Sequence, residues 1–105
     1  MDDNFKCIYR ILTAFEKSLD LPEFDIADIS AKTLGVSETR RVKYLEMLAN
    51  AGYITGVEFR EDITGETDII ARNPLITIKG LEYLSENTIM QRMYKAMKGI
   101  KDIVR

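Results

Sequence analysis

Apolar residues near the start of the chain recur every three or four positions, which is the spacing of one helical face. This face carries Phe5, Ile8, Leu12, Phe15 and Leu19. An acidic or amide residue at positions 2–4 can cap this helix, and Pro22 stops it. Residues 21–24 are then predicted to form a short extended segment, at most a minimal strand.

Two further helices are predicted before the first long strand. Asp25 is the expected N-cap of the first, which Gly35 closes. Its apolar residues are Ile26, Ile29 and Leu34. Ser37 caps the next helix, which continues until Gly52 ends it. The core stripe of that helix is formed by Leu45, Leu48 and Ala49.

A β-hairpin follows these helices. Apolar and charged residues alternate toward the end of residues 53–60, which is the period of a half-buried strand. Residues 62–65 form the expected turn, and residues 67–71 form the return strand. The pair Asn73-Pro74 is expected to break that strand, because proline has no backbone N–H to donate.

Two more helices complete the chain. Thr77 caps a helix that contains Ile78, Leu81 and Leu84. The last helix, within residues 87–105, opens at Thr88 with Gln91 as its capping-box partner. One side of it is apolar, formed by Ile89, Met93, Ala96, Met97, Ile100, Ile103 and Val104. The other side is basic, formed by Arg92, Lys95, Lys98, Lys101 and Arg105.

Composition limits the chemistry of the chain. With 105 residues, 46% of them apolar and 30% charged, residues 1–105 form a single globular domain, and a net charge of -2 excludes a strongly basic coat protein. There is no histidine, and Cys7 is the one cysteine, expected as a small core residue. Disulfides, cysteine–histidine zinc sites and histidine-based catalysis are therefore excluded. Although a carboxylate-only cation site stays open, we predict no catalytic residue, metal, cofactor or enzymatic activity.

The sequence also bears on where the protein works. Its acidic beginning, Met1-Asp2-Asp3, has the wrong charge for a signal peptide. No apolar run approaches the roughly 20 residues that span a bilayer. A lone cysteine suits a reducing compartment. We therefore expect a cytoplasmic protein without a membrane partner.

The order of these elements resembles a winged helix-turn-helix. Residues 29–37 resemble its second helix and sharp turn, with Gly35 at the turn. Residues 48–54 resemble the end of a recognition helix that enters the wing, and residues 76–84 resemble the exit from the wing. The predicted fold is mainly α with a small β-hairpin (α+β), a winged helix with an added amphipathic C-terminal helix.

Several segments together resemble the YjcQ protein family over essentially the whole chain. They are Tyr9-Arg-Ile-Leu, Pro22-Glu-Phe-Asp-Ile26, Leu34-Gly-Val-Ser37, Leu45-Glu-Met-Leu48, Gly52-Tyr-Ile54, Asn73-Pro74, Thr77-Ile-Lys-Gly-Leu-Glu-Tyr-Leu84 and the tail from Tyr94 to Ile103. The resemblance implies a small winged-helix protein of Gram-positive bacteria or their prophages, and no established activity. Arg41 departs from the family, which tends to carry an apolar residue there.

The third predicted helix carries the main signal for DNA binding. With Leu45 and Leu48 pointing inward, Arg40 and Lys43 lie on the outer side, where a recognition helix contacts bases and phosphates. Arg41 falls between the two leucines, so we expect its stem to follow the core edge and its charge to pair with an acid. The candidate DNA-contacting residues are Ser37, Thr39, Arg40, Lys43, Lys95 and Lys98.

The charges of the wing and of residues 92–105 allow a second interpretation of the protein's function. Residues 58–68 of the wing carry five carboxylates against Arg60 alone, and phosphates would repel them. Residues 92–105 carry a charge of +4, which suits a helix C-terminus, a DNA flank, a partner-binding helix or a homodimer seam. The sequence therefore predicts a DNA-binding winged-helix protein that acts as a transcription regulator, and the resemblance to the YjcQ protein family implies a phage or prophage setting. The alternative is a winged-helix protein-interaction module that binds no DNA.

Overall fold

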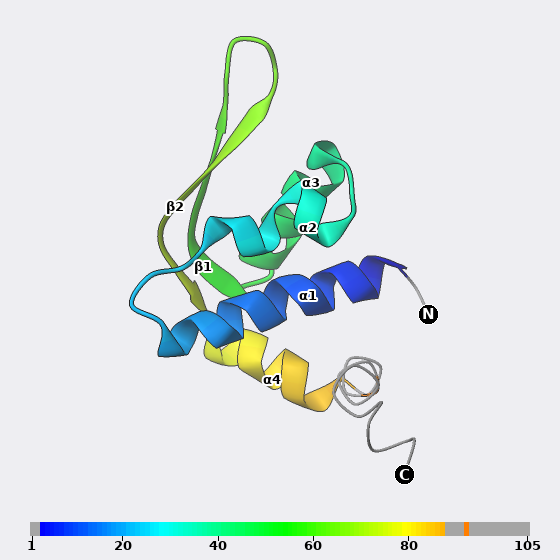
Figure 1. The fold of residues 1–105 in the computed structure, drawn as a ribbon, viewed down its shortest axis with the longest axis vertical. Helices are drawn as coiled ribbons and strands as arrows, with labels where there is room; N and C mark the ends of the chain where they lie inside the picture. The colour runs from blue at the N-terminus through cyan, green and yellow to red at the C-terminus, as the bar shows by residue number, and fades with distance from the viewer. Residues whose placement is uncertain (1–2, 88–91, 93–105) are drawn as a thin grey trace.

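The computed structural model describes residues 3–87 and Arg92. Its elements, including the short 3-10 helices η1 and η2, are α1 (Asp3–Lys17), η1 (Ser18–Asp20), η2 (Ile26–Ile29), α2 (Ala31–Leu34), α3 (Glu38–Asn50), β1 (Ile54–Glu61), β2 (Thr67–Ile76) and α4 (Ile78–Glu86). The helices pack together, and the β1–β2 hairpin extends away from them as a wing (Figure 1). The predicted α+β winged-helix layout is confirmed. The last predicted helix, including Lys95 and Lys98, lies outside the described residues.

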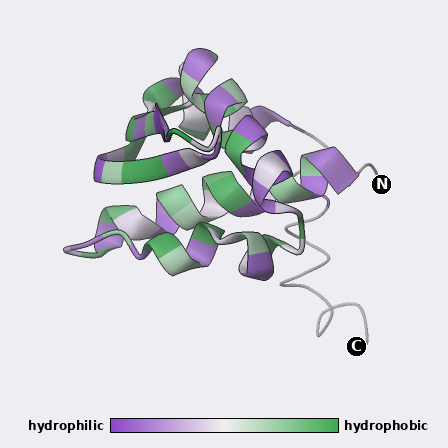
Figure 2. Ribbon diagram, turned by 90° about the horizontal axis from the view of Figure 1, so that it is seen from above, coloured by the Kyte–Doolittle hydropathy of each residue, from purple (hydrophilic) through white to green (hydrophobic). Residues whose placement is uncertain are grey.

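The apolar face of α1 is rotated slightly from the one its sequence predicts. The buried residues of α1 are Cys7, Tyr9, Ile11, Leu12 and Phe15. The predicted Leu19 is 49% exposed, because the chain leaves the α-helix after Lys17. Ser18 marks this end by donating its hydroxyl to the Phe15 carbonyl at 2.6 Å. Cys7 is buried, as predicted. Figure 2 shows hydrophobic and hydrophilic residues alternating in short bands along the helices.

The expected minimal strand at residues 21–24 is absent. Among the described residues the sheet has two strands, β1 and β2. Packing holds this segment instead, since the Phe24 ring lies 4.7 Å from the Phe15 ring, centroid to centroid. Pro22 also removes one of the N–H groups that strand pairing needs.

The predicted second helix is divided into two pieces. Asp25 caps η2 as predicted, accepting a hydrogen bond from the Ala27 N–H at 3.0 Å. Ser30 then has an extended backbone, and its hydroxyl accepts the Thr33 N–H at 3.1 Å, which caps α2. A serine that can bond a nearby backbone group competes with a continuous helix. Gly35 ends α2 in the left-handed conformation (φ 71°), as the sequence predicts.

The return strand β2 is longer than predicted. It passes through Pro74 and reaches Ile76, which pairs with Ile54. The register shifts around Gly56, whose φ of 79° and close approach to the Asn73 carbonyl leave no room for a side chain. The predicted break is therefore wrong: proline sits within a bulge, where the ladder of hydrogen bonds is interrupted anyway.

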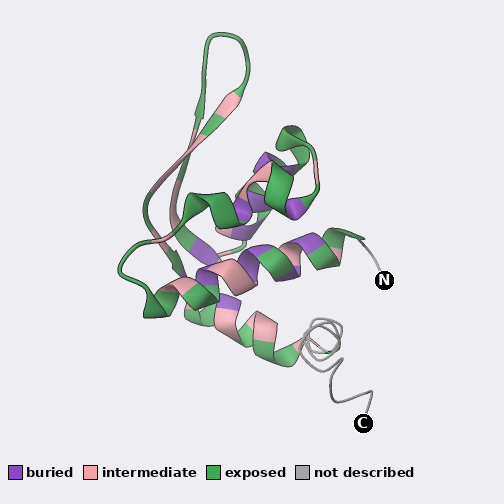
Figure 3. Cartoon of the chain, in the orientation of Figure 1, coloured by how far each residue is buried: buried purple, intermediate pink, exposed green. Residues whose placement is uncertain are grey.

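One core joins α1, α2, α3 and the base of the wing, and it fixes the position of α3. Leu34, Leu45 and Leu48 are buried together, with Ile54 and Ile76 from the base of the wing. Thr77 caps α4 by accepting the Gly80 N–H at 3.0 Å, and it donates its hydroxyl to the Gly52 carbonyl. Figure 3 shows buried residues on α1, α3 and the base of the wing, whereas the tip of the wing is exposed.

Candidate nucleic-acid interface

The start of α3 is held by local hydrogen bonds. Gly35 and Val36 donate their N–H groups to the Ala31 carbonyl at 2.8 and 3.1 Å, which closes α2 and sets the turn. Ser37 then caps α3, because its hydroxyl oxygen accepts the Arg40 N–H at 3.1 Å. Ser37 is exposed, so its hydroxyl hydrogen lies at the surface. The turn therefore presents the N-terminal end of α3 to solvent.

Arg40 is exposed but anchored. Its Nη1 donates to the Asn4 Oδ1 at 2.8 Å and to the Tyr44 hydroxyl at 3.0 Å. Its guanidinium carbon lies 5.8 Å from the centroid of the Tyr44 ring. The Tyr44 hydroxyl also donates to Asn4, so these three side chains join the start of α1 to α3. Sequence reasoning foresaw the outward position of Arg40 and missed this anchor.

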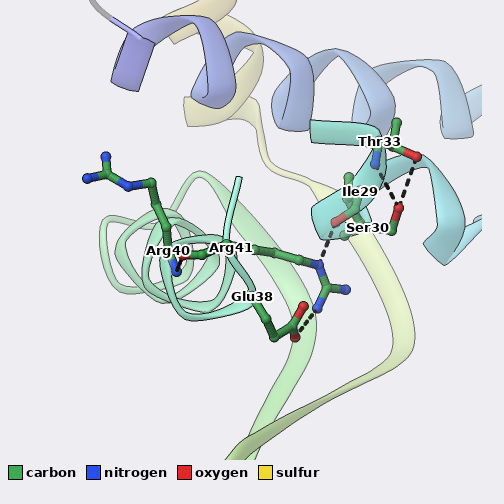
Figure 4. A network of polar contacts seen from close by, with 7 residues as sticks. Ile29, Ser30, Thr33, Glu38, Arg40 and Arg41 are labelled. Carbon is green, nitrogen blue, oxygen red and sulfur yellow. Dashed lines mark hydrogen bonds and ion pairs between the residues drawn. The ribbon is translucent and has the colours of Figure 1, made fainter. Parts of the chain in front are cut away.

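Arg41 points the opposite way, into the protein (Figure 4). It is 8% exposed, its Nε donates to the Ile29 carbonyl at 2.6 Å, and its Nη1 forms an ion pair with Glu38 at 2.8 Å. The prediction that its stem follows the core edge and that its charge pairs with an acid is confirmed. A buried arginine thus ties α3 to η2.

Two cations of α1 lie beside the N-terminal end of α3. Lys6 and Arg10 line a surface hollow of about 660 Å³ together with Ser37, Arg40 and one acidic residue, Asp3. Burial raises the pKa of the nearby Cys7 thiol, and the charges of Arg10 and Arg40 act in the opposite direction. Lys43 lines a neighbouring hollow that also includes Arg40. We call Lys6, Arg10, Arg40 and Lys43 the basic cluster. Lys6 and Arg10 were missed by sequence reasoning, because only the apolar face of this helix was considered there.

The other side of α3 is acidic. A groove of about 350 Å³ separates α3 from the wing, and its walls carry Glu38 and Glu46 on α3, and Glu66 and Asp68 on the wing. Lys43 is the one cation that lines it. The predicted repulsion between wing and phosphate therefore extends to the α3 side that faces the wing. Among the described residues, positive charge therefore outweighs negative charge on the side of α3 toward α1, and the reverse holds on the side toward the wing.

The wing turn itself is ordered by Asp62. Its Oδ1 accepts hydrogen bonds from the Thr64 N–H at 2.8 Å, the Thr64 hydroxyl at 2.6 Å and the Glu66 N–H at 3.1 Å. These bonds, the Thr64 hydroxyl bond first, lower the pKa of the Asp62 carboxyl below its usual value. Further down the wing, Glu58 pairs with Arg72 at 2.7 Å. The wing is thus an acidic hairpin whose turn is ordered by hydrogen bonds.

Other predicted features have simpler outcomes. Thr39 is exposed on the outer face of α3, as predicted. No cluster of three or more histidine, cysteine or acidic side chains suited to a metal is present among residues 3–87 and Arg92. Within that same part of the chain, no helix is both long and apolar enough to cross a membrane. Asn87 ends α4 with an extended backbone.

The chain is similar to proteins of one known family. The family model described as YjcQ protein matches residues 9–103. The uncharacterized protein YjcQ of Bacillus subtilis (strain 168) is 34% identical over 101 residues, which cover 95% of this chain and 96% of that protein. The solution NMR structure of the YjcQ protein from Bacillus subtilis is similar with a TM-score of 0.53 and 29% identity, covering 76% of this chain and 90% of that one. The chain therefore belongs to the YjcQ protein family.

Proposed function

We propose that this protein is a winged-helix DNA-binding protein that acts as a transcription regulator, with no catalytic activity. The observation that carries the proposal is the basic cluster, in which Lys6 and Arg10 of α1 lie beside Arg40 of α3. Double-stranded DNA attracts such a cluster, because each neutralised phosphate releases counterions. A cytoplasmic location and a phage or prophage setting are parts of the same hypothesis.

The positions of these residues suggest which of them would contact phosphates and which would contact bases. Lys6, Arg10 and the Ser37 hydroxyl suit phosphates, and the partial positive charge at the N-terminal end of α3 adds to their attraction. Thr39, Arg40 and Lys43 are exposed on α3, the element that a winged helix places in the major groove. Lys95 and Lys98, outside the described residues, would flank the same DNA.

In this arrangement the wing stands away from DNA. Its carboxylates line the groove on the far side of α3, so an approach of DNA from that side meets like charge. DNA would therefore approach from the α1 side. Arg40 would keep its bonds to Asn4 and Tyr44 while its exposed edge faces a base.

Binding to mixed-sequence duplex DNA, measured by fluorescence anisotropy across a salt series, tests the proposal. Replacing Lys6 and Arg10 with Gln should weaken binding to all sequences alike and reduce the salt slope by about two units. Lys43→Ala should also weaken binding to all sequences and reduce the salt slope by about one unit. Arg40→Ala should reduce the binding free energy by about 1–3 kcal/mol if Arg40 contacts a guanine edge. Lys79→Gln, on α4, is the matched control and should change nothing.

A second function is favoured by the acidic groove. Four carboxylates on facing walls, with a single lysine, suit a basic protein segment better than a nucleic acid. In that case the protein is a winged-helix interaction module without DNA binding. The same salt series separates the two functions: no salt-sensitive binding to DNA at about 50 mM salt overturns the DNA proposal and leaves the interaction module.

A further inference from the structure

The tip of the wing presents an apolar side chain to solvent. All of residues 61–66 are exposed, and Ile63 is completely so, at 104% of its reference area. The hydrogen bonds to Asp62 order the turn that carries Ile63. Glu61, Asp62 and Glu66 surround it with negative charge, and none of the three forms an ion pair in the described part of the chain. The tip is thus an apolar projection with an acidic rim.

A surface of the opposite character lies between α1 and α3. It is a hollow of about 590 Å³, which we call the α1–α3 hollow. Its lining residues are Asn4, Phe5, Ile8, Ser37, Thr39, Arg40, Lys43, Tyr44 and Met47. Among the described residues, the lining includes two cations and no carboxylate, and Met47 is 53% exposed. The hollow is therefore an apolar depression with a basic rim.

The wing tip and the α1–α3 hollow complement each other, because both have an apolar centre and their rims carry opposite charges. We propose that the wing tip of one copy docks into the α1–α3 hollow of a second copy of this chain. Ile63 would cover the apolar floor beside Met47, which removes exposed apolar area of both residues from water. Glu61 and Glu66 of the tip would face Arg40 and Lys43 of the rim, which sets the orientation.

The contact forms between copies, not within one. No wing residue lines the α1–α3 hollow of its own chain. Instead, wing residues 65–68 line the acidic groove with Glu38 and Glu46, and no residue of α1 lines that groove. If two copies dock about a twofold axis, each inserts one tip and receives one. The assembly then closes with two identical contacts.

This inference does not rest on DNA binding, although it bears on it. The docked tip would cover Arg40 and Lys43, two residues of the basic cluster. Association of two copies and binding of DNA would then compete for the same surface. Self-association is measured without DNA, so its failure and the failure of the DNA proposal are separate results.

Sedimentation velocity of the full chain, from micromolar concentration to about 0.5 mM, tests the docking. We expect reversible dimers that weaken as salt is raised to about 0.5 M, because the rim charges are then screened. Ile63→Asp damages the tip and Met47→Asp damages the hollow, and each should lower the association constant at least tenfold. Circular dichroism confirms that each variant is folded. The matched control is Ile78→Asp, since Ile78 on α4 is 78% exposed and lies in neither surface.

A mixing experiment gives the decisive result. Ile63→Asp keeps an intact hollow and Met47→Asp keeps an intact tip, so an equimolar mixture can form one undamaged contact. One Asp at the apolar floor is enough to open a contact, so a second Asp opposite it costs nothing further. The mixture should therefore associate more strongly than either variant alone. The proposal is overturned by a wild-type protein that stays monomeric at about 0.5 mM, by a mixture no stronger than its components, or by an equal loss in Ile78→Asp.

Discussion

Truncation of Arg41 tests how α3 is held against η2. Arg41→Ala removes a charge-assisted hydrogen bond to the Ile29 carbonyl at 2.6 Å, a kind of bond that contributes about 1.5–3 kcal/mol. It also removes the ion pair with Glu38, but the Glu38 side chain is 61% exposed, so that pair adds about 0–1 kcal/mol. Loss of the buried stem adds about 0.8 kcal/mol for each methylene that was covered. We expect a total loss of about 3–5 kcal/mol in the free energy of unfolding.

Urea unfolding followed by circular dichroism measures this loss. Glu38→Gln is the matched control, because it weakens the ion pair and leaves the bond to Ile29; it should cost no more than about 1 kcal/mol. Arg41→Met retains most of the stem and should fall between the two. The reasoning is refuted if Arg41→Ala costs less than about 0.5 kcal/mol, or if Glu38→Gln costs as much as Arg41→Ala.

Three further changes test the core, the bulge and the wing. Leu45→Ala should destabilise the fold by about 2–5 kcal/mol in urea unfolding, because Leu45 is completely buried; a loss below about 0.5 kcal/mol would show that α3 is not seated as described. Gly56→Ala places a Cβ 1.9 Å from the Asn73 carbonyl oxygen at a φ of 79°, so it should cost more than about 1 kcal/mol and shift the NMR signals of β1 and β2; unchanged signals would contradict the bulge. Because folding lowers the pKa of Asp62, its contribution to wing order is complete above its unfolded pKa and is lost as pH falls through the lower folded value. NMR signals of the wing turn should therefore shift below about pH 4 in the wild type and not in Asp62→Asn; identical pH profiles would refute this role.

Local features of the sequence were sufficient to predict several helix boundaries. Ser37 and Thr77 cap helices, and Gly35 ends one, because each acts on backbone groups within a few residues of itself. The inward position of Arg41 was also predictable, since the angle between neighbouring residues on a helix is constant. Similar reasoning placed Arg40 on the outer face of α3.

The predictions from the local sequence were wrong at Pro74 and Leu19. Pro74 breaks a regular strand, yet β2 continues through it because Gly56 on the partner strand permits a bulge. Leu19 fits the helical period of α1, but the chain turns away before it reaches the core. For Pro74 the deciding residue lies on the partner strand, outside the local pattern. For Leu19 the helical period gives the face of the helix but not the residue at which the helix ends.

The candidate site was less predictable from the sequence than the helices and strands, because it depends on tertiary structure. Asn4 and Arg40 are 36 positions apart, and only the packing of α1 against α3 brings them within a hydrogen bond. The same packing places Lys6 and Arg10 beside the start of α3. The sequence by itself determined which residues are charged and on which side of their own helix they lie. Which of those sides face one another depends on how the helices pack around the shared core, because charges far apart in sequence act together only when folding brings them close.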